Sequence, residues 1–244
     1  MIPNTLTRTK NATFSILVPH PNPAYQGFPT ANGTGFFISS DGYFITARHV
    51  LFDFSKIMLN KPELFTSLFI TGLQLVKEWT AYDLVLLKAN FDMAKTQKAF
   101  KEKTSFDYLD IEYEVTPEGT DVYSFGYPLA QCEVKGTSAM LVGFHYDCPR
   151  VTSAVISSHY DVIGPVRVDS GFPRNYVIDK ALNYGNSGGP LVLQQSGKAI
   201  AVITRFQPVN IPQQAGSKIM IPSLYGIASS LKNIENDLKS LIKP

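Results

Sequence analysis

The chain has 244 residues, of which 22 are Lys or Arg and 20 are Asp or Glu, so its formal net charge is +2. This length suits one large or two small globular units with substantial cores. Because the charges nearly balance and no long run of one sign occurs, we expect no nucleic-acid partner. No stretch of about 18 or more apolar residues is present, and we expect no membrane partner either.

The first part of the chain alternates short apolar runs with turn residues, which predicts β-strands. The runs are rich in Phe, Ile, Val, Tyr and Thr, and residues that favour turns separate them. The predicted strands are residues 13–18, 35–38, 43–46, 68–76 and 84–87.

Residues 90–118 change in character and predict a connection between two units. They are polar, rich in lysine and poor in β-branched residues, with a possible helical turn at residues 93–101. The lysines of this segment predict a solvated surface and not a binding patch. We therefore divide the chain into residues 1–105, which include the linker, and residues 106–244.

The second part of the chain again predicts strands and then changes period. The predicted strands are residues 122–125, 140–144, 151–157, 176–178, 191–193 and 199–204. From Leu224 to Leu241, apolar residues recur at three- and four-residue spacings, which predicts an amphipathic helix at about residues 224–242. Pro222 and Ser223 would stop the preceding strand and cap this helix.

The most informative segment is residues 185–190, Gly-Asn-Ser-Gly-Gly-Pro, directly before a predicted strand. A serine nucleophile needs its Oγ exposed at a tight turn, beside amides that converge on one small space. Glycines permit such a turn. The segment predicts Ser187 as the nucleophile and an oxyanion hole formed by residues 185–187, with the amides of Gly185 and Ser187 as donors and Asn186 between them. The alternative is a glycine-rich hairpin with an incidental serine.

A serine hydroxyl is a weak nucleophile, so this hypothesis requires a histidine base and a carboxylate that orients it. His49 follows the predicted strand 43–46 and is the candidate base. Asp83 stands directly before the apolar run 84–87, at the entrance of a buried strand, and is the candidate carboxylate. Taken alone, His49 could be an ordinary core or surface histidine, and Asp83 an ordinary turn residue.

Four segments together resemble the chymotrypsin-like serine peptidases, with the order His, Asp, Ser. They are residues 34–39, 42–50, 82–87 and 185–190, and the bacterial HtrA/Deg proteases are most similar in motif. The likeness extends over about residues 33 to 230. It implies an all-β fold of two six-stranded antiparallel β-barrels with the triad between them, followed by the C-terminal α-helix. The first barrel would carry His49 and Asp83, and the second would carry Ser187.

The same resemblance implies an S1 pocket, which binds the P1 side chain of a substrate. Ala181 would lie at its base, and Val202 and Thr204 would form its wall. An apolar pocket offers no partner to a buried charge, so we expect a preference for small or aliphatic P1 residues. Lys180 and Arg205 are close enough in sequence to favour an acidic P1 residue instead.

These observations predict a serine endopeptidase that acts on polypeptides without a metal or other cofactor. One alternative is a protein of the same fold that binds or scaffolds without useful turnover. Another is an esterase, although the Gly-x-Ser-x-Gly elbow of α/β-hydrolases is a different motif in a different setting.

Two further expectations concern the cellular compartment and the bonding state of the cysteines. The first residues lack the continuous apolar segment of a secretory signal, which favours a cytoplasmic location over a mature secreted form. Cys132 and Cys148 are compatible with two buried thiols or with one disulfide.

Overall fold

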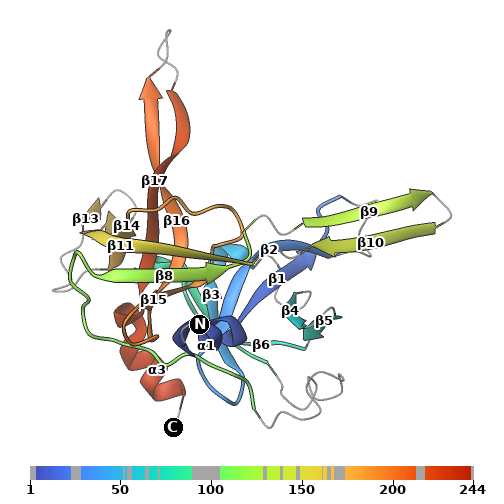
Figure 1. The fold of residues 1–244 in the computed structure, drawn as a ribbon, viewed down its shortest axis with the longest axis horizontal. Coiled ribbons are helices and arrows are strands. Elements are labelled where there is room, and N and C mark those ends of the chain that lie inside the picture. Colours follow the sequence, from blue (N-terminus) through green and yellow to red (C-terminus); the bar gives the residue numbers. More distant parts are fainter. Residues whose placement is uncertain are drawn as a thin grey trace.

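The computed structural model of the protein is dominated by antiparallel strands (Figure 1). It describes residues 4–22, 29–51, 53, 57–63, 66–70, 72–89, 105–128, 131–137, 140–146, 149–160, 162–163, 166–167, 174–212 and 218–242. The predicted helical turn at residues 93–101 lies outside these ranges. Cys148 does too, so the structure does not address its pairing with Cys132.

The N-terminal half forms one seven-stranded antiparallel sheet. Its strands, in spatial order, are β5 (Thr66–Ile70), β4 (Met58–Glu63), β1 (Thr13–Pro19), β2 (Pro29–Phe37), β3 (Tyr43–Ala47), β7 (Leu84–Lys88) and β6 (Gln74–Trp79). In the described part of the chain, no hydrogen-bonded pairing joins the edge strands β5 and β6. The single strand expected over residues 68–76 is wrong, because β5 and β6 are separate. Gly72, with φ at 72°, lies between them in a left-handed conformation that regular extended strand does not have.

The C-terminal half forms the expected closed barrel of six antiparallel strands. Around the barrel these are β11 (Arg150–Tyr160), β14 (Asn175–Ile178), β17 (Lys218–Ser230), β16 (Ala199–Pro212), β15 (Pro190–Leu193) and β8 (Asp121–Gly126). The predicted strand 140–144 belongs to β10 (Met140–Tyr146), which pairs with β9 (Gln131–Thr137) in a separate hairpin. Two short strands, β12 (Val162–Ile163) and β13 (Val166–Arg167), form another. The β9–β10 hairpin and the outer parts of β16 and β17 extend away from the body of the protein (Figure 1).

The C-terminal helix begins later than the sequence pattern predicts. Residues 224–230 belong to β17, which pairs with β14 on one side and β16 on the other. Hydrogen bonding on both edges of the strand outweighs the helical spacing of its apolar residues. A 3₁₀ turn, Leu231–Ile234, leads into the helix α3 (Glu235–Leu241). The side chain of Ser230, not Ser223, caps this 3₁₀ turn by accepting a hydrogen bond from the Lys232 amide.

A short helix that the sequence pattern did not predict, α1 (Asn4–Ala12), packs between the two halves. The Thr9 hydroxyl lies 2.8 Å from the Tyr123 hydroxyl on β8. The Arg8 guanidinium pairs with Asp110 at 2.8 Å. The first described element is thereby fixed to the second half of the chain.

The central core is shared between the two halves and α3. Trp79 and Leu84 from the N-terminal sheet pack in one buried cluster with Val202 from β16 and Leu238 from α3. The Trp79 indole nitrogen also donates a hydrogen bond to the Asp237 carboxylate. These contacts hold the sheet against the barrel and so position the cleft between them.

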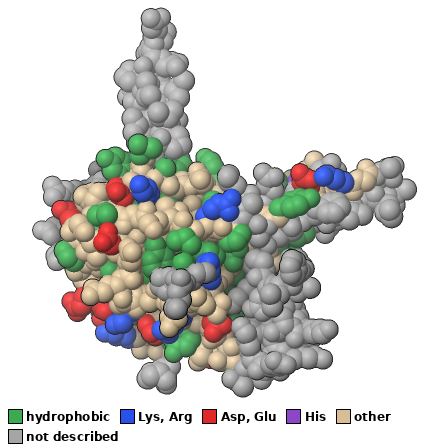
Figure 2. All heavy atoms as spheres, in the orientation of Figure 1, with side chains coloured by type: hydrophobic (Ala, Val, Ile, Leu, Met, Phe, Trp, Pro, Cys, Tyr) green, Lys and Arg blue, Asp and Glu red, His purple; other side chains and the backbone are tan. Residues whose placement is uncertain are grey.

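On the face shown in Figure 2, basic and acidic side chains lie interspersed. In the ranges given above, no helix is long and apolar enough to cross a membrane.

Candidate active site

The loop that carries Ser187 runs into β15 and depends on glycine. Gly185 and Gly188 have φ values of 95° and 87°, which residues with a Cβ rarely adopt. A Cβ at Gly188 would lie 2.0 Å from the Thr34 carbonyl oxygen and 2.1 Å from the Thr46 hydroxyl. The loop therefore packs directly against β2 and β3 of the N-terminal sheet.

Hydrogen bonds leave two amides of this loop available. The Asn186 amide donates to the Asn183 carbonyl at 3.1 Å, and the Gly188 amide donates to the Ile203 carbonyl at 2.7 Å. In the described part of the chain, the amides of Gly185 and Ser187 have no backbone acceptor. Asn186 is 4% exposed, and its amide is occupied, so this residue shapes the turn without offering a donor.

His49 lies in a 3₁₀ turn, Arg48–Val50, that follows β3. Its ring Nδ1 is 2.6 Å from Asp83 Oδ2, and its backbone amide donates to Asp83 Oδ1 at 3.0 Å. The Asn32 side-chain amide donates to the Val50 carbonyl at 2.6 Å and holds the end of the turn. These bonds direct the other ring nitrogen of His49 away from Asp83.

Asp83 occupies an unusual backbone position at the start of β7. Its φ of 56° and ψ of 38° are left-handed, and it is the one non-glycine residue with positive φ among those described. Such a conformation costs on the order of 1 kcal/mol, although Asp and Asn tolerate it best. The Asp83 carbonyl accepts from the Arg48 amide at 2.9 Å, so three bonds from residues 48 and 49 converge on this residue.

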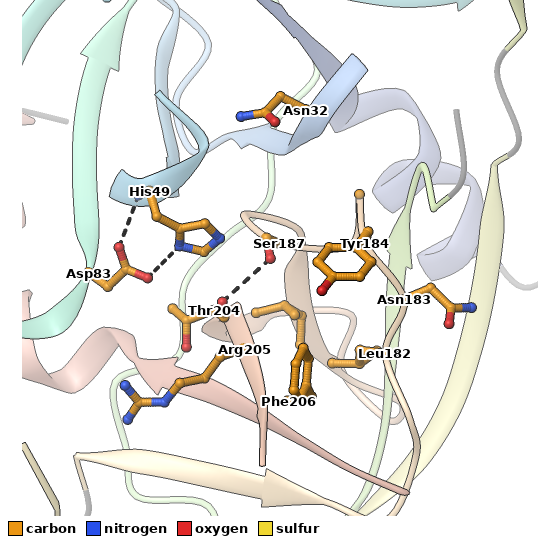
Figure 3. Close-up of a pocket in the computed structure, with 12 residues that line it drawn as sticks. Asn32, His49, Asp83, Leu182, Asn183, Tyr184, Ser187, Thr204, Arg205 and Phe206 are labelled. Atoms are coloured by element: carbon orange, nitrogen blue, oxygen red, sulfur yellow. Dashed lines mark hydrogen bonds and ion pairs between the residues drawn. The ribbon is translucent and has the colours of Figure 1, made fainter. Parts of the chain in front are cut away.

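The structure brings Ser187, His49 and Asp83 to one cleft with a volume of about 520 Å³ (Figure 3). The Ser187 hydroxyl donates to the Thr204 carbonyl at 3.4 Å, and within the described residues no bond joins it to His49. The His49 and Asp83 side chains remain 47% and 33% exposed, respectively. The His49 ring is thus oriented by the Asp83 carboxylate, while the Ser187 hydroxyl is directed to a different acceptor.

The remaining cleft wall differs in part from the predicted S1 pocket. Thr204 lines the cleft as expected. Val202 does not, because it is fully buried in the central core. A register shift between Ile203 and Arg205 breaks the alternation that would otherwise place Val202 and Thr204 on one face of the strand. Ala181 is exposed and lies outside the lining, which begins with the next residue, Leu182.

Leu182 closes the base of this region against β17. A Cβ at Gly226 would lie 2.5 Å from Leu182 Cδ1, so the leucine fits only because residue 226 has no side chain. Tyr184 and Phe206 form the rim, with ring centroids 6.4 Å apart in an edge-on arrangement. Arg205 also lines the cleft (Figure 3).

Sequence reasoning did not assign Asn32, Leu182, Tyr184 or Phe206 to the cleft. Leu182 and Tyr184 could have been found from their position just before the serine motif. Asn32 and Phe206 carry no local signal, because they reach the cleft only when the N-terminal sheet and the C-terminal barrel come together. Among the described residues, no group of three or more His, Cys, Asp or Glu side chains could hold a metal ion.

Comparison with known proteins places the chain in a family. The family model described as a trypsin-like peptidase domain matches residues 33–202. The chain belongs to the trypsin-like peptidase family. Its matched segment contains His49, Asp83 and Ser187, and it ends within β16.

Two curated relatives of this peptidase domain are named probable periplasmic serine endoprotease DegP-like, from Bartonella henselae and Rhizobium meliloti. Each is 31% identical to it over 186 residues. The matched segments cover 74% of the chain and 29% of each relative, so the chain corresponds to less than a third of their length. The resemblance to HtrA/Deg proteases is confirmed.

Solved structures of the same class confirm the fold. The MamO protease domain of Magnetospirillum magneticum superposes with a TM-score of 0.59 at 17% identity, covering 96% of this chain and 99% of that one. The HtrA-type protease AlgW with a tripeptide gives a TM-score of 0.62 at 19% identity, covering 98% and 63%. At these identities the likeness concerns the trypsin-like fold alone.

The names of the relatives correct one expectation. The sequence favoured a cytoplasmic location, because its first residues lack a recognisable signal segment. Both DegP-like relatives are named periplasmic, which contradicts the cytoplasmic prediction, and that prediction is wrong.

Proposed function

We propose that this peptidase domain is a serine endopeptidase that cleaves polypeptides through an acyl-enzyme intermediate, outside the cytoplasm. Ser187 Oγ attacks the peptide carbonyl, and His49 accepts its proton and returns it to the leaving amine. Asp83 holds the histidine in the tautomer that leaves Nε2 free to accept. No step of this acyl transfer requires a metal or cofactor.

The observation that carries the proposal is the double contact between Asp83 and His49 beside a serine loop in which two amides have no backbone acceptor among the described residues. One carboxylate oxygen accepts from the ring and the other from the backbone, so ring and main chain are oriented together. The Gly185 and Ser187 amides can donate to the oxyanion that forms in the reaction, and one such donor is worth about 2.7 to 4 kcal/mol.

We further propose a preference for small or aliphatic P1 residues. Leu182 packs onto Gly226 at the base of the cleft and reduces the depth available to a substrate side chain. The nearby lining is largely apolar, with Ile203 and Phe206, which favours hydrocarbon over a buried charge. Profiling of cleavage sites in a peptide library tests this. Dominant cuts after Asp, Glu, Lys or Arg would refute it.

The decisive experiment is labelling of the intact protein with a fluorophosphonate probe, compared with Ser187→Ala. We expect labelling and peptide turnover in the wild type and neither in the variant. Circular dichroism of both proteins confirms that they are folded. Equal and weak labelling of two folded proteins would contradict the peptidase proposal.

One observation favours the second candidate, a protein of this fold that binds without turnover. The Ser187 hydroxyl donates to Thr204 and not to His49, which is an arrangement without an activated nucleophile. The same experiment separates the two functions, because a folded binding protein would show neither labelling nor peptide turnover even with Ser187 in place.

A further inference from the structure

Thr34 belongs to β2 of the N-terminal sheet, yet three of its hydrogen bonds reach the C-terminal barrel. Its hydroxyl donates to the Gly185 carbonyl at 2.6 Å and accepts from the Tyr127 amide at 3.1 Å. Its own amide donates to the Ser187 carbonyl at 2.8 Å. The residue is completely buried. The hydroxyl and the backbone amide of Thr34 thus hold the carbonyl groups of Gly185 and Ser187, which lie on either side of Asn186.

The direction of the hydroxyl bond follows from its neighbours. The Tyr127 amide can only donate, so it takes a lone pair of the Thr34 oxygen. The hydroxyl proton is then available for the Gly185 carbonyl, which can only accept. This buried hydroxyl is thus both a donor and an acceptor, and its two hydrogen bonds can run in only one direction.

These contacts immobilise the peptide planes around the nucleophile. The plane between residues 185 and 186 is held at its oxygen by Thr34 and at its N–H by the Asn183 carbonyl, at 3.1 Å. The plane between residues 187 and 188 is held at its oxygen by the Thr34 amide and at its N–H by the Ile203 carbonyl, at 2.7 Å. The amides of Gly185 and Ser187 border these two fixed planes.

The atoms around Thr34 are also closely packed. A Cβ at Gly126 would lie 3.1 Å from the Thr34 hydroxyl, and a Cβ at Gly188 would lie 2.0 Å from its carbonyl oxygen. A Cβ at Gly189 would lie 3.3 Å from its methyl group. Three glycines therefore allow a threonine of one sheet to enter the serine loop of the other half.

We propose that Thr34 is a positioning residue for the oxyanion hole, aiming the Gly185 and Ser187 amides from across the cleft. The inference rests on the proposed peptidase function. The orientation of the two amides then depends on the hydroxyl of Thr34, and not only on the conformation of the loop itself. A shift of about 1 Å in such a group costs on the order of 100-fold in rate.

The test compares Thr34→Val, which keeps the shape and loses the hydroxyl, with Thr34→Ser, which keeps the hydroxyl. We expect Thr34→Val to lower kcat by about 10- to 100-fold with KM changed by less than about threefold. Thr34→Ser should recover most of kcat. Thr13→Val is the matched control, because Thr13 is equally buried and its hydroxyl donates to the Thr9 carbonyl, away from the cleft. The control should leave kcat within about twofold.

A second measurement does not depend on turnover. In ¹⁵N-labelled protein, the amide chemical shifts of Gly185 and Ser187 should change in Thr34→Val and stay close to wild type in Thr34→Ser and Thr13→Val. Unchanged shifts in a folded Thr34→Val protein would overturn the inference, whatever the activity. An active wild type with an equally active Thr34→Val would overturn it while leaving the peptidase proposal intact. If the shifts change in Thr34→Val but the wild type shows no Ser187-dependent turnover, the positioning role is supported and the peptidase proposal is refuted.

Discussion

Asp83 contacts His49 twice, through the ring Nδ1 at 2.6 Å and through the backbone amide at 3.0 Å. The second contact ties the carboxylate to the main chain of the residue that it orients. The left-handed backbone of Asp83 and its bond from the Arg48 amide keep this geometry fixed from the other side. The pair is therefore formed within the N-terminal sheet, before any substrate is bound.

Asp83→Asn tests the role of this carboxylate. Asn also tolerates the left-handed conformation, so the fold should be retained. An amide NH₂ group facing Nδ1 would favour the wrong tautomer of His49, and we expect kcat to fall by about 10,000-fold at neutral pH. Steady-state kinetics with a peptide substrate measures this. Glu78→Gln, which alters the neighbouring pair with Arg48 at 2.8 Å, should change kcat by less than about twofold. Equal losses in both variants would contradict a specific role for Asp83.

Leu182→Ala tests the base of the cleft. Removing the branched end of Leu182 opens space above Gly226, so the variant should accept larger P1 side chains. We expect the ratio of kcat/KM for a P1 Phe substrate over a P1 Val substrate to rise by about 10-fold. Val202→Ala is the control. It should lower the free energy of unfolding by about 2 kcal/mol, because Val202 is buried in the central core, and leave the ratio unchanged. A changed ratio in Val202→Ala would show that Val202 does contribute to the P1 pocket.

The contact of Asp237 with Trp79 and Lys77 predicts a pH-dependent stability. Hydrogen bonds from Trp79, and then from Lys77, hold the pKa of Asp237 below its ordinary value. The stabilisation is fully present above the unfolded-state pKa of about 3.9 and is lost as the pH falls through the lower folded-state pKa. Asp237→Asn should therefore reduce stability by about 1 kcal/mol at neutral pH and show a flatter loss of stability in acid.

Urea unfolding followed by fluorescence measures this effect directly, since Trp79 is the only tryptophan of the chain. Asp110→Asn, in the exposed pair with Arg8, is the matched control and should cost less than about 0.5 kcal/mol. The same acid dependence in Asp237→Asn and wild type would show that Asp237 does not contribute it.

Two glycines with positive φ allow the cost of backbone strain to be measured separately from the cost of a steric clash. Gly119 has φ at 81°, and among the described residues nothing lies within 4 Å of the position that an added methyl group would take, so Gly119→Ala should cost about 1 kcal/mol. Gly188 has φ at 87° and would place the methyl group 2.0 Å from the Thr34 carbonyl oxygen, so Gly188→Ala should cost about 4 kcal/mol and the catalytic activity. Thermal unfolding of the two variants compares them. Similar losses would mean that the serine loop can move away from β2.

The parts of the fold that follow local patterns were predictable. The strands β1, β3, β7 and β15 coincide with apolar runs, and the glycines around Ser187 identify a turn whose φ values require them. The helix at residues 224–242 was predicted too early because the pairing of β17 on both edges is a tertiary effect. The residues of the cleft wall were predicted less well, because an irregularity in the pairing of β16 between Ile203 and Arg205 changes which side chains face the cleft, and no local sequence pattern marks it. Thr34 bonds to residues 93 and 151 positions away, a distance that no sequence pattern records.

The shared central core has a consequence for how the protein is made. Trp79 and Leu84, on the strands that flank Asp83, are buried partly by Leu231 and Leu238 near the end of the chain. At ordinary rates of translation, residues 231–238 leave the ribosome roughly 10 to 40 seconds after the first strands. During that interval the nascent N-terminal sheet presents an apolar face without its cover. The cleft between the sheet and the barrel is consequently assembled only after residues 231–238 have been synthesised, and a polypeptide released before that point would be prone to aggregate.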